Sequence, residues 1–308
     1  MAMSDTVSTP TANLSPRARI DAYVRLLRID KPIGTLLLLW PTMSALWFAA
    51  DGAPRVSLVV IFAVGTFIMR SAGCALNDWA DRDFDAAVKR TASRPLAAKI
   101  IAPWEALAFA IALALAAFVL ILPTNRATIA WSIPALAITI AYPFFKRFFA
   151  LPQAFLGIAF SFGIPMAFAA VQNAVSSFAW VLLVINLFWV VAYDTEYAMV
   201  DRDDDVNIGI HTSALTFGRF DITAVAVCYA IYIGAMSVVG FRNAMGTMYY
   251  AGLAVAFAFA VQHLWWIRTR EREACFRAFL DNHWLGFAVF SGVALDFAVR
   301  LHRWPHVF

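Results

Sequence analysis

The chain has 308 residues, of which 62% are hydrophobic and only 14% are charged. A soluble domain of this length does not carry so much apolar surface, so the composition excludes a soluble enzyme and favours an integral membrane protein. The net charge of +4 does not indicate a nucleic-acid partner, because the basic residues flank apolar segments. The cysteines Cys74, Cys228 and Cys275 have neither metal-ligand spacing nor a disulfide pattern.

The N-terminal end differs in composition from the rest of the chain. Residues 1–16 are rich in Ser, Thr and Pro and contain no apolar run, so we expect a disordered tail there rather than a signal peptide. A single transmembrane domain is expected over residues 17–308, and its apolar stretches are predicted to be helices, because only helices satisfy their own backbone groups in lipid. There are nine such stretches, at 33–50, 56–76, 104–122, 127–145, 153–172, 178–193, 213–240, 246–267 and 284–303. The predicted fold class is therefore an all-α integral membrane protein with nine transmembrane helices.

Lysine and arginine residues are unevenly distributed between the connections of these predicted helices. Seventeen flank the helix ends on the side of the N-terminus, and five flank the opposite ends. Because the side richer in Lys and Arg faces the cytoplasm, we expect the N-terminus to be cytoplasmic, together with the connections after the second, fourth, sixth and eighth helices. An odd number of helices then places the C-terminus outside.

An acidic segment begins at Asn77, directly after the second predicted helix and on the cytoplasmic side. Residues four apart share a face of a helix, so Asn77, Asp81 and Asp85 are predicted to form one stripe of oxygen ligands. The same geometry turns Asp78 and Asp83 away from this stripe, and we expect those two side chains to face water.

A second acidic segment follows the sixth predicted helix, and in it Asp201 and Asp205 repeat the four-residue spacing. Like charges four apart destabilise a helix by roughly 0.2–0.5 kcal/mol per pair unless a counter-ion lies between them. Oxygen ligands without His or Cys favour a hard cation, and Mg²⁺ typically binds carboxylates together with the phosphate oxygens of a substrate. We therefore predict a magnesium site whose ligands are Asn77, Asp81, Asp85, Asp201 and Asp205.

Basic residues lie close to these acidic segments on the cytoplasmic side. They are Lys89, Arg90 and Arg94 after the first segment, and Lys146 and Arg147, which follow Tyr142 after the fourth predicted helix. Arg and Lys are the usual partners of phosphate groups, so this arrangement indicates a diphosphate site. One acidic loop is usually a solvated turn and a basic loop is usually a topology signal, but two matching acidic stripes on one side of a membrane favour a functional site.

Arg70 differs from the other cations because it lies inside the second predicted helix, seven residues before Asn77. A charge at that depth is costly and usually faces a cavity within the protein. Three kinds of partner are compatible with its position: the carboxylate of an aromatic substrate, an oxygen of the diphosphate, or a polar group of the protein itself.

The combination of these segments resembles the UbiA family of membrane prenyltransferases over nearly the whole chain. Asn77-Asp78-x-x-Asp81-x-x-x-Asp85 and Asp201-x-x-x-Asp205 are similar to the two aspartate-rich motifs of that family. Tyr142-Pro-Phe-Phe-Lys146 resembles its Tyr-x-x-x-Lys element, and the segment from Lys89 to Pro95 resembles its basic segment. Within the family, the stretches 28–34, 193–205 and 270–276 are most similar to the proteobacterial 4-hydroxybenzoate polyprenyltransferases of ubiquinone biosynthesis.

The resemblance implies nine helices around a central cavity, with a cap and magnesium at the cytoplasmic end, in a bacterial inner membrane. It implies transfer of a polyprenyl chain from polyprenyl diphosphate to the carbon ortho to the hydroxyl of 4-hydroxybenzoate. Membrane lipid is the only other partner implied, without nucleic acid or an obligate protein partner. Residues and resemblance together predict catalytic roles for Asp81, Asp201, Lys146 and Asp194, and substrate binding by Lys89, Arg90, Arg94, Tyr142, Arg147, Arg70 and Arg28.

One position departs from the pattern of that family. After the second motif the family usually has Ile-Gly-Ile-Lys-Ser-Thr, whereas this chain has His211 in place of the Lys and continues with Thr212 and Ser213. If that Lys touches phosphate, His211 supplies less positive charge near pH 7. The residue that removes the ring proton also stays open, with Asp194 and Asp78 as candidates.

Other functions compete with this one. A different aromatic acceptor, such as a naphthoate, haem or chlorophyllide, would use the same chemistry. A cation transporter is disfavoured because transport carboxylates usually lie near the middle of the membrane at broken helices, and here they lie at helix ends beside Lys and Arg. A CDP-alcohol phosphotransferase is disfavoured because its Asp-Gly-x-x-Ala-Arg pattern is absent from the sequence.

Overall fold

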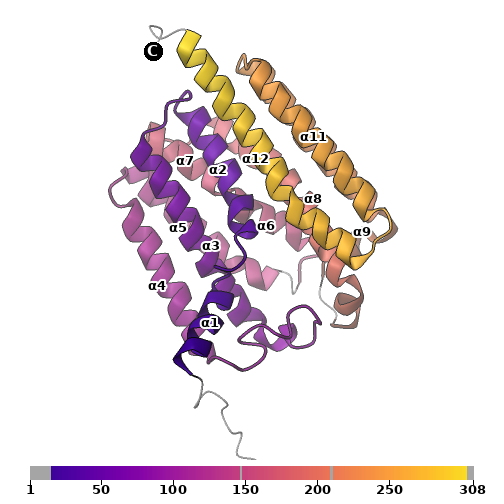
Figure 1. The fold of residues 1–308 in the computed structure, drawn as a ribbon. Coiled ribbons are helices and arrows are strands. Elements are labelled where there is room, and N and C mark those ends of the chain that lie inside the picture. Colours follow the sequence, from indigo (N-terminus) through magenta and orange to yellow (C-terminus); the bar gives the residue numbers. More distant parts are fainter. Residues whose placement is uncertain (1–14, 146–147, 209–210, 304–308) are drawn as a thin grey trace, which may run out of the picture.

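The computed structural model describes residues 15–145, 148–208 and 211–303, and within these ranges the chain is helical and contains no β-strand (Figure 1). The predicted all-α class is therefore confirmed. The helices are α1 (Pro16–Leu26), α2 (Ile33–Ala49), α3 (Val56–Asp85), α4 (Pro103–Ile121), α5 (Arg126–Phe145), α6 (Pro152–Ser161), α7 (Gly163–Gln172), α8 (Ser177–Ile208), α9 (Ser213–Phe217), the 3₁₀ turn η2 (Gly218–Phe220), α10 (Asp221–Arg242), α11 (Thr247–Ile267) and α12 (Arg272–Arg303). Residues 1–14 of the predicted tail lie outside the described residues, and Ser15 caps α1 by accepting a hydrogen bond from the N–H of Ala18 at 3.3 Å.

Eight helical segments in the described ranges are long and apolar enough to cross a membrane, and the apolar helix α2 is shorter, with 17 residues. Each of the nine predicted stretches corresponds to one of these segments, but nine crossing helices are not confirmed. The fifth stretch is divided into α6 and α7 near Pro165, which lacks the N–H that a continuous helix needs. α3 and α8 are longer than predicted, because both helices continue into the acidic segments.

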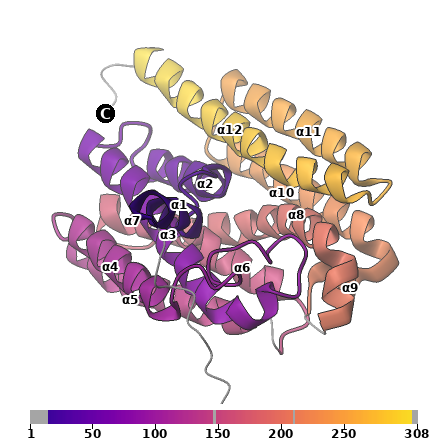
Figure 2. The same ribbon diagram turned by 60° about the horizontal axis from the view of Figure 1, so that its bottom comes forward.

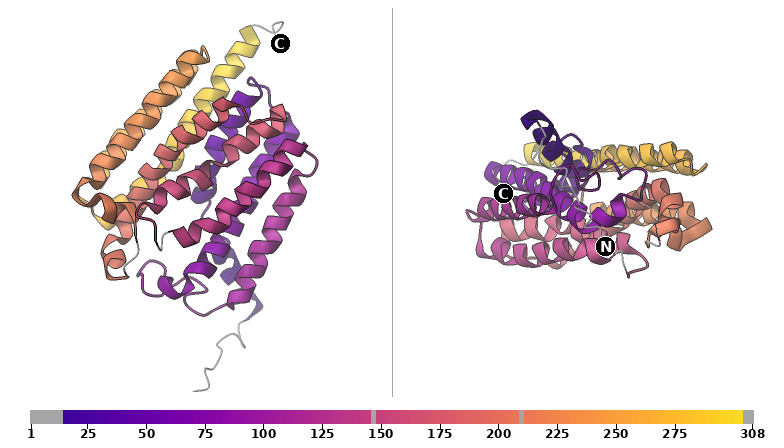
Figure 3. Two further views of the ribbon diagram at one scale, coloured as in Figure 1. Left: turned by 180° about the vertical axis from the view of Figure 1, so that it is seen from behind. Right: turned by 90° about the horizontal axis from the view of Figure 1, so that it is seen from below.

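The helices pack as a bundle in which α11 and α12 lie side by side along one edge, while α4 and α5 lie along the opposite edge (Figures 1 and 3). α11 and α12 approach most closely at Gly252 and Gly292. A Cβ added to Gly252 would lie 2.6 Å from the carbonyl oxygen of Ala288 and 2.8 Å from the Cα of Gly292. Small residues of this kind let helix backbones meet, which is how membrane helices commonly associate.

α1 and the connection between α3 and α4 lie at one end of the bundle, and the C-terminal end of α12 lies at the other (Figures 1 and 2). We call residues 16–31 together with residues 86–102 the cap. Arg19 and Tyr23 fasten the cap to α4, because both donate hydrogen bonds to the carboxylate of Glu105, at 2.9 and 2.5 Å. The acidic end of α3 leads directly into the cap, so the cap is positioned to cover the candidate site.

A buried group of polar side chains joins α8, α10, α11 and α12. The hydroxyl of Tyr229 donates to Glu196 at 2.9 Å and lies 3.1 Å from Nδ1 of His263. Asn282 donates to the second carboxylate oxygen of Glu196 at 2.8 Å and accepts a hydrogen bond from Trp189 at 2.9 Å. All five side chains are buried. Because these polar groups satisfy one another away from water, the network ties four helices together.

Tyr229→Phe is expected to lower the free energy of unfolding by about 1–2 kcal/mol, because it leaves Glu196 and His263 each short of a hydrogen-bond partner. Thermal unfolding of the purified protein in detergent measures the change. Tyr250→Phe is the control, since Tyr250 is 39% exposed and its hydroxyl makes a long bond of 3.3 Å to the carbonyl of Ser237. An unchanged unfolding midpoint for Tyr229→Phe would contradict a stabilising role for this network.

Candidate active site

At the acidic end of α3, two buried carboxylates share one face of the helix. α3 continues as one helix through Asp85, so the four-residue spacing places Asp81 and Asp85 on the same face. Both residues are buried, at 2% and 7% exposure, whereas the side chain of Asp83 between them is 78% exposed. Asn77, one turn earlier, is half-buried. The two carboxylates are therefore surrounded by protein rather than by water.

The acidic end of α8 has the same character. Asp201 and Asp205 are both buried near the end of this helix. Asp194 and Tyr197 precede Asp201 by seven and four residues, so they share its face of the helix, and both are half-buried. This face of α8 therefore combines three carboxylates with one aromatic ring.

Arg90 of the cap forms an ion pair with Asp201 of α8. Its Nε lies 3.0 Å from each carboxylate oxygen, and its Nη2 also bonds to Oδ2. The guanidinium stands over the ring of Tyr197, 4.4 Å from the centroid, in a cation–π contact. Arg90 follows the last residue of α3 by only five positions, so this ion pair brings the acidic ends of α3 and α8 together.

Arg94 of the cap binds two carboxylates of α3, Asp78 at 3.0 Å and Asp85 at 2.8 Å. Arg28, also in the cap, donates from Nη2 to both oxygens of Asp78 at 2.9 Å. The prediction that Asp78 faces water is wrong: its exposure is 1%, because these two arginines cover it. Burial by itself lowers the pKa of Arg94, but the charges of Asp78 and Asp85 outweigh burial and raise that pKa, so Arg94 is a permanent cation.

Arg70 lies deeper in α3, and its guanidinium is held from two sides. It stands over the ring of Phe160, 5.6 Å from the centroid. It also presses against Gly34, where an added Cβ would come within 2.7 Å of both Nε and Nη2. Nε has no hydrogen-bond partner within the described residues. Arg70 is thus fixed in place by packing and keeps a donor for another group.

Tyr142 of α5 is half-buried, and α5 packs against α3, the helix that carries Arg70 and Asp81. Lys89 is exposed on the cap. Lys146 and Arg147 lie outside the described residues, so their predicted roles stay predictions.

Three residues that the sequence patterns did not single out take part in this arrangement: Tyr197, Gly34 and Phe160. Tyr197 precedes Asp201 by one helical turn, so helix periodicity carries a usable signal for it. Gly34 and Phe160 come from separate segments and meet only at Arg70. No local pattern indicates such a contact.

The donor chemistry of the site fits a hard divalent cation, because buried oxygen ligands without His or Cys are typical of Mg²⁺. Four of the predicted ligands are buried carboxylates, those of Asp81, Asp85, Asp201 and Asp205. In the described part of the chain, however, no three His, Cys, Asp or Glu side chains are grouped closely enough to hold a metal ion. Asp85 and Asp201 are bound by arginines instead. The residue types fit the metal, whereas the ion pairs would have to rearrange to admit it.

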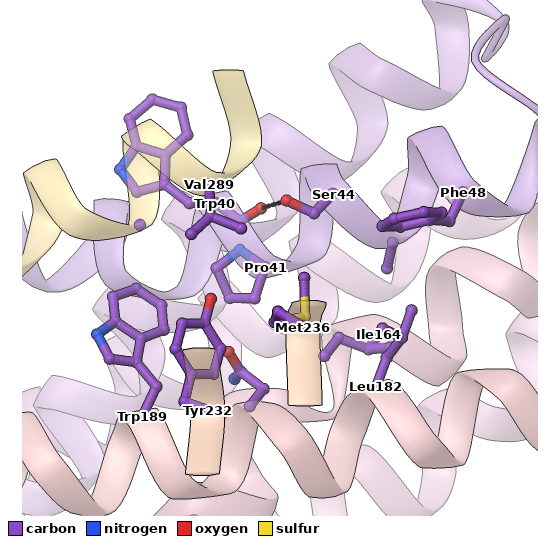
Figure 4. Close-up of a pocket in the computed structure, with 13 residues that line it drawn as sticks. Trp40, Pro41, Ser44, Phe48, Ile164, Leu182, Trp189, Tyr232, Met236 and Val289 are labelled. Atoms are coloured by element: carbon purple, nitrogen blue, oxygen red, sulfur yellow. Dashed lines mark hydrogen bonds between the residues drawn. The ribbon is translucent and has the colours of Figure 1, made fainter. Parts of the chain in front are cut away.

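An apolar pocket lies deeper in the bundle, between α2, α8, α10 and α12 (Figure 4). Trp40, Phe48, Trp189 and Tyr232 are among the side chains that line it. Trp189 precedes Asp201 by twelve residues on α8, so it lies about 18 Å from the acidic end along the helix axis. The lining is mainly aromatic and aliphatic, but the free volume of about 20 Å³ leaves room for no more than a water-sized group.

The sequence matches the model of the UbiA prenyltransferase family over residues 38–289. It is similar to the 4-hydroxybenzoate octaprenyltransferase of Paraburkholderia phymatum, with 60% identity over 283 residues that cover 92% of this chain and 99% of the relative. The 4-hydroxybenzoate octaprenyltransferase of Ralstonia nicotianae is 61% identical over 283 residues, which cover 92% of this chain and 97% of the relative. These alignments span nearly the whole length of each protein.

Solved structures of similar fold include UbiA homologs from two organisms. A UbiA homolog from Aeropyrum pernix K1 has a TM-score of 0.75 at 21% identity, covering 85% of this chain and 97% of that chain. A UbiA homolog from Archaeoglobus fulgidus bound to GPP and Mg²⁺ has a TM-score of 0.67 at 18% identity, with 88% and 99% covered. A structure of the Archaeoglobus fulgidus homolog bound to Cd²⁺ has a TM-score of 0.66 at 17% identity, with 90% and 98% covered. At these identities the likeness concerns the fold.

Proposed function

Because the chain belongs to the UbiA prenyltransferase family, we propose that it transfers a polyprenyl chain from polyprenyl diphosphate to 4-hydroxybenzoate in ubiquinone biosynthesis. The new bond forms at the ring carbon ortho to the hydroxyl, and diphosphate is released. One observation carries this proposal: two 4-hydroxybenzoate octaprenyltransferases are 60% and 61% identical to the chain over 92% of its length. The protein is therefore an enzyme and a multi-pass integral membrane protein. The names of those relatives favour an octaprenyl chain as the group transferred.

The metal of this site is proposed to be Mg²⁺. The structures of Archaeoglobus fulgidus UbiA homologs with Mg²⁺ or Cd²⁺ support a divalent ion, and the oxygen-only donor set of this chain favours Mg²⁺. When bound, such an ion neutralises part of the charge that develops on the departing diphosphate. The proposed ligands come from the ends of α3 and α8, and they are Asn77, Asp81, Asp85, Asp201 and Asp205.

Arg90 and Arg94 are proposed to bind the diphosphate from the side of the cap. Both arginines contact carboxylates of the site, so a phosphate group held there lies within their reach. As the allylic C–O bond breaks, negative charge grows on the leaving oxygens, and guanidinium donors aimed at those oxygens stabilise it. The prenyl group is left as an allylic cation or a tight ion pair. Apolar and aromatic side chains keep water away until the acceptor ring attacks.

Arg70 is proposed to bind the carboxylate of 4-hydroxybenzoate. Packing against Phe160 and Gly34 fixes its guanidinium, and Nε still has a hydrogen to donate. Asp194 is the better of the two candidates for the base that takes the ring proton. Asp78 is less suited to this task, because Arg28 and Arg94 already bind its carboxylate.

We place the active site at the cytoplasmic face of a bacterial inner membrane. The cap carries many of the basic residues that predict a cytoplasmic side, and it covers the acidic ends of α3 and α8. α1 and the end of α12 lie at opposite ends of the bundle, as expected when an odd number of segments crosses the membrane (Figure 1). The C-terminal end of α12 is then periplasmic.

A competition assay tests the proposed reaction. The purified protein in lipid nanodiscs is supplied with octaprenyl diphosphate, Mg²⁺ and an equimolar mixture of 4-hydroxybenzoate, a dihydroxynaphthoate, haem and chlorophyllide, and products are identified by mass spectrometry. Prenylated 4-hydroxybenzoate is expected as the main product, abolished by EDTA and restored by added Mg²⁺. Faster prenylation of another acceptor would contradict 4-hydroxybenzoate as the substrate. Activity that survives EDTA would contradict the requirement for Mg²⁺.

Gly34→Ala is expected to raise the KM for 4-hydroxybenzoate by about tenfold and to leave the KM for the diphosphate nearly unchanged. The added Cβ would lie 2.7 Å from two nitrogens of Arg70, so the guanidinium must leave the position in which it meets the carboxylate. Gly65→Ala on α3 is the control, because its Cβ would meet Leu120 at an ordinary 3.7 Å. Steady-state kinetics with each substrate varied in turn measure both constants. An unchanged KM for 4-hydroxybenzoate would show that Gly34 has no part in acceptor binding.

A further inference from the structure

We infer that Arg90 and Arg94 are exchangeable counter-ions, which hold carboxylates of the metal site until the diphosphate draws them away. Metal and diphosphate then bind cooperatively, each raising the affinity of the protein for the other. This inference rests on the proposed function, and it adds a mechanism by which the site resists occupation by a cation alone.

The first observation is that Arg90 occupies both carboxylate oxygens of Asp201. Arg90 contacts both carboxylate oxygens of Asp201, with Nε at 3.0 Å from each. The pair is partly buried, with the Asp201 side chain 9% exposed, so solvent does little to weaken it. A metal ion that binds Asp201 has to displace a guanidinium from the oxygens it needs.

The second observation is an asymmetry on α3. Arg94 divides its bonds between Asp78 and Asp85, but Arg28 also binds both oxygens of Asp78. When Arg94 leaves, Asp78 keeps a counter-ion. Asp85 loses the arginine that binds it, so it is the carboxylate that becomes available to a metal.

The third observation is that Arg90 has a second support besides its carboxylate. Its guanidinium lies 4.4 Å from the ring centroid of Tyr197, and this ring is stacked on Phe279 at 4.3 Å between centroids. A cation over an aromatic face keeps its in-plane N–H groups for other acceptors. Arg90 can therefore turn from Asp201 to a phosphate oxygen while it stays over Tyr197.

The charges explain why the two ligands bind together. A divalent ion that enters alone brings positive charge beside two arginines and has to compete with them for the carboxylates. A diphosphate that enters alone meets the buried carboxylates as like charges. When both bind, the arginines move to phosphate oxygens, with which guanidinium forms bidentate bonds, and the carboxylates turn to the metal. Binding of each ligand thus removes the electrostatic cost of binding the other, and this coupling is reciprocal.

Metal binding without diphosphate tests the inference directly. Mn²⁺ serves as the probe, and electron paramagnetic resonance of the free ion measures its binding to the purified full-length protein in nanodiscs. We expect weak binding by the unsubstituted protein and affinities about tenfold higher for Arg90→Gln and for Arg94→Gln, since each frees a buried carboxylate. Arg270→Gln is the matched control, because Arg270 also pairs with a buried aspartate, Asp221, which is not among the proposed ligands and keeps Arg202 as a second partner. Its Mn²⁺ affinity should equal that of the unsubstituted protein.

Binding of radiolabelled inorganic pyrophosphate completes the test. The unsubstituted protein should retain pyrophosphate only when Mn²⁺ is present, and both arginine variants should retain it about tenfold less tightly. Mn²⁺ affinities that are unchanged or lower in both variants, while the unsubstituted protein still binds Mn²⁺ with pyrophosphate, would overturn the exchange and leave the proposed metal site standing. If no protein binds Mn²⁺, with or without pyrophosphate, both the exchange of the arginines and the proposed metal site are contradicted. Two separate variants guard against a folding defect in either one, and size-exclusion profiles check each protein.

Discussion

Asp201→Asn is expected to lower the rate of prenyl transfer by about 10²–10³-fold while the protein still inserts and folds. Asp201 is buried at the end of α8, where the proposed site needs an anionic oxygen. The amide has nearly the same shape and still accepts a hydrogen bond from Arg90, so the fold is preserved. It carries no charge for a metal ligand, and the leaving diphosphate loses the electrostatic support that the metal supplies.

Two further variants make this result specific. Asp81→Asn on α3 should cause a similar loss, because Asp81 is equally buried and belongs to the same proposed ligand set. Asp203→Asn on α8 should keep nearly full activity, since Asp203 is exposed two residues beyond Asp201. Initial rates with saturating substrates and Mg²⁺ compare the three proteins. Near-normal rates in Asp201→Asn would rule out its role in metal binding.

Arg70→Gln is expected to raise the KM for 4-hydroxybenzoate by about 10–100-fold, because an acceptor carboxylate in a pocket away from water then lacks its counter-ion. The KM for the diphosphate should change little, since Arg70 precedes Asp81 by eleven residues on α3, about 16 Å along the helix axis. An acceptor without the carboxylate, such as a 4-substituted phenol, should react at similar rates with Arg70→Gln and the unsubstituted protein. Arg82→Gln is the control on the same helix, and it should leave both constants unchanged.

The same kinetics decide between the partners that the sequence leaves open for Arg70. A rise in the KM for the diphosphate, with that for 4-hydroxybenzoate unchanged, would assign Arg70 to the leaving group instead. A loss of thermal stability with both constants unchanged would make Arg70 a packing residue for Phe160 and Gly34. Each outcome therefore identifies one partner.

Helix periodicity was sufficient to predict that Asp81 and Asp85 share a face, because this relation depends on residues within one helix. The burial of Asp78 follows from contacts with Arg28, 50 residues away, and Arg94, 16 residues away. The path of the cap determines those contacts, and no local pattern encodes that path. Arg90 illustrates the same limit, since its partner Asp201 lies 111 residues further along the chain.

Hydropathy located the membrane segments but not all of their ends. α12 begins at Arg272, whereas the apolar stretch begins at 284. The earlier part of this helix includes Asn282, which is polar but buried against Glu196 and Trp189. A hydropathy window counts such a residue as solvent-facing, although a hydrogen-bonded partner on another helix lets it lie in the interior. The sequence also gave no indication that His263 belongs to the buried polar network, because a single His in an apolar segment carries no periodic signal.

The convergence of α3 and α8 on one metal-bound diphosphate is tested most directly by an experimental structure of this protein with a non-hydrolysable prenyl thiodiphosphate and Mn²⁺, whose anomalous scattering locates the ion. We expect Mn²⁺ within about 2.0–2.4 Å of carboxylate oxygens from both Asp81 and Asp201, with Arg90 and Arg94 turned onto the phosphate oxygens. A metal bound elsewhere, or a diphosphate held while Arg90 still pairs with Asp201, would contradict it.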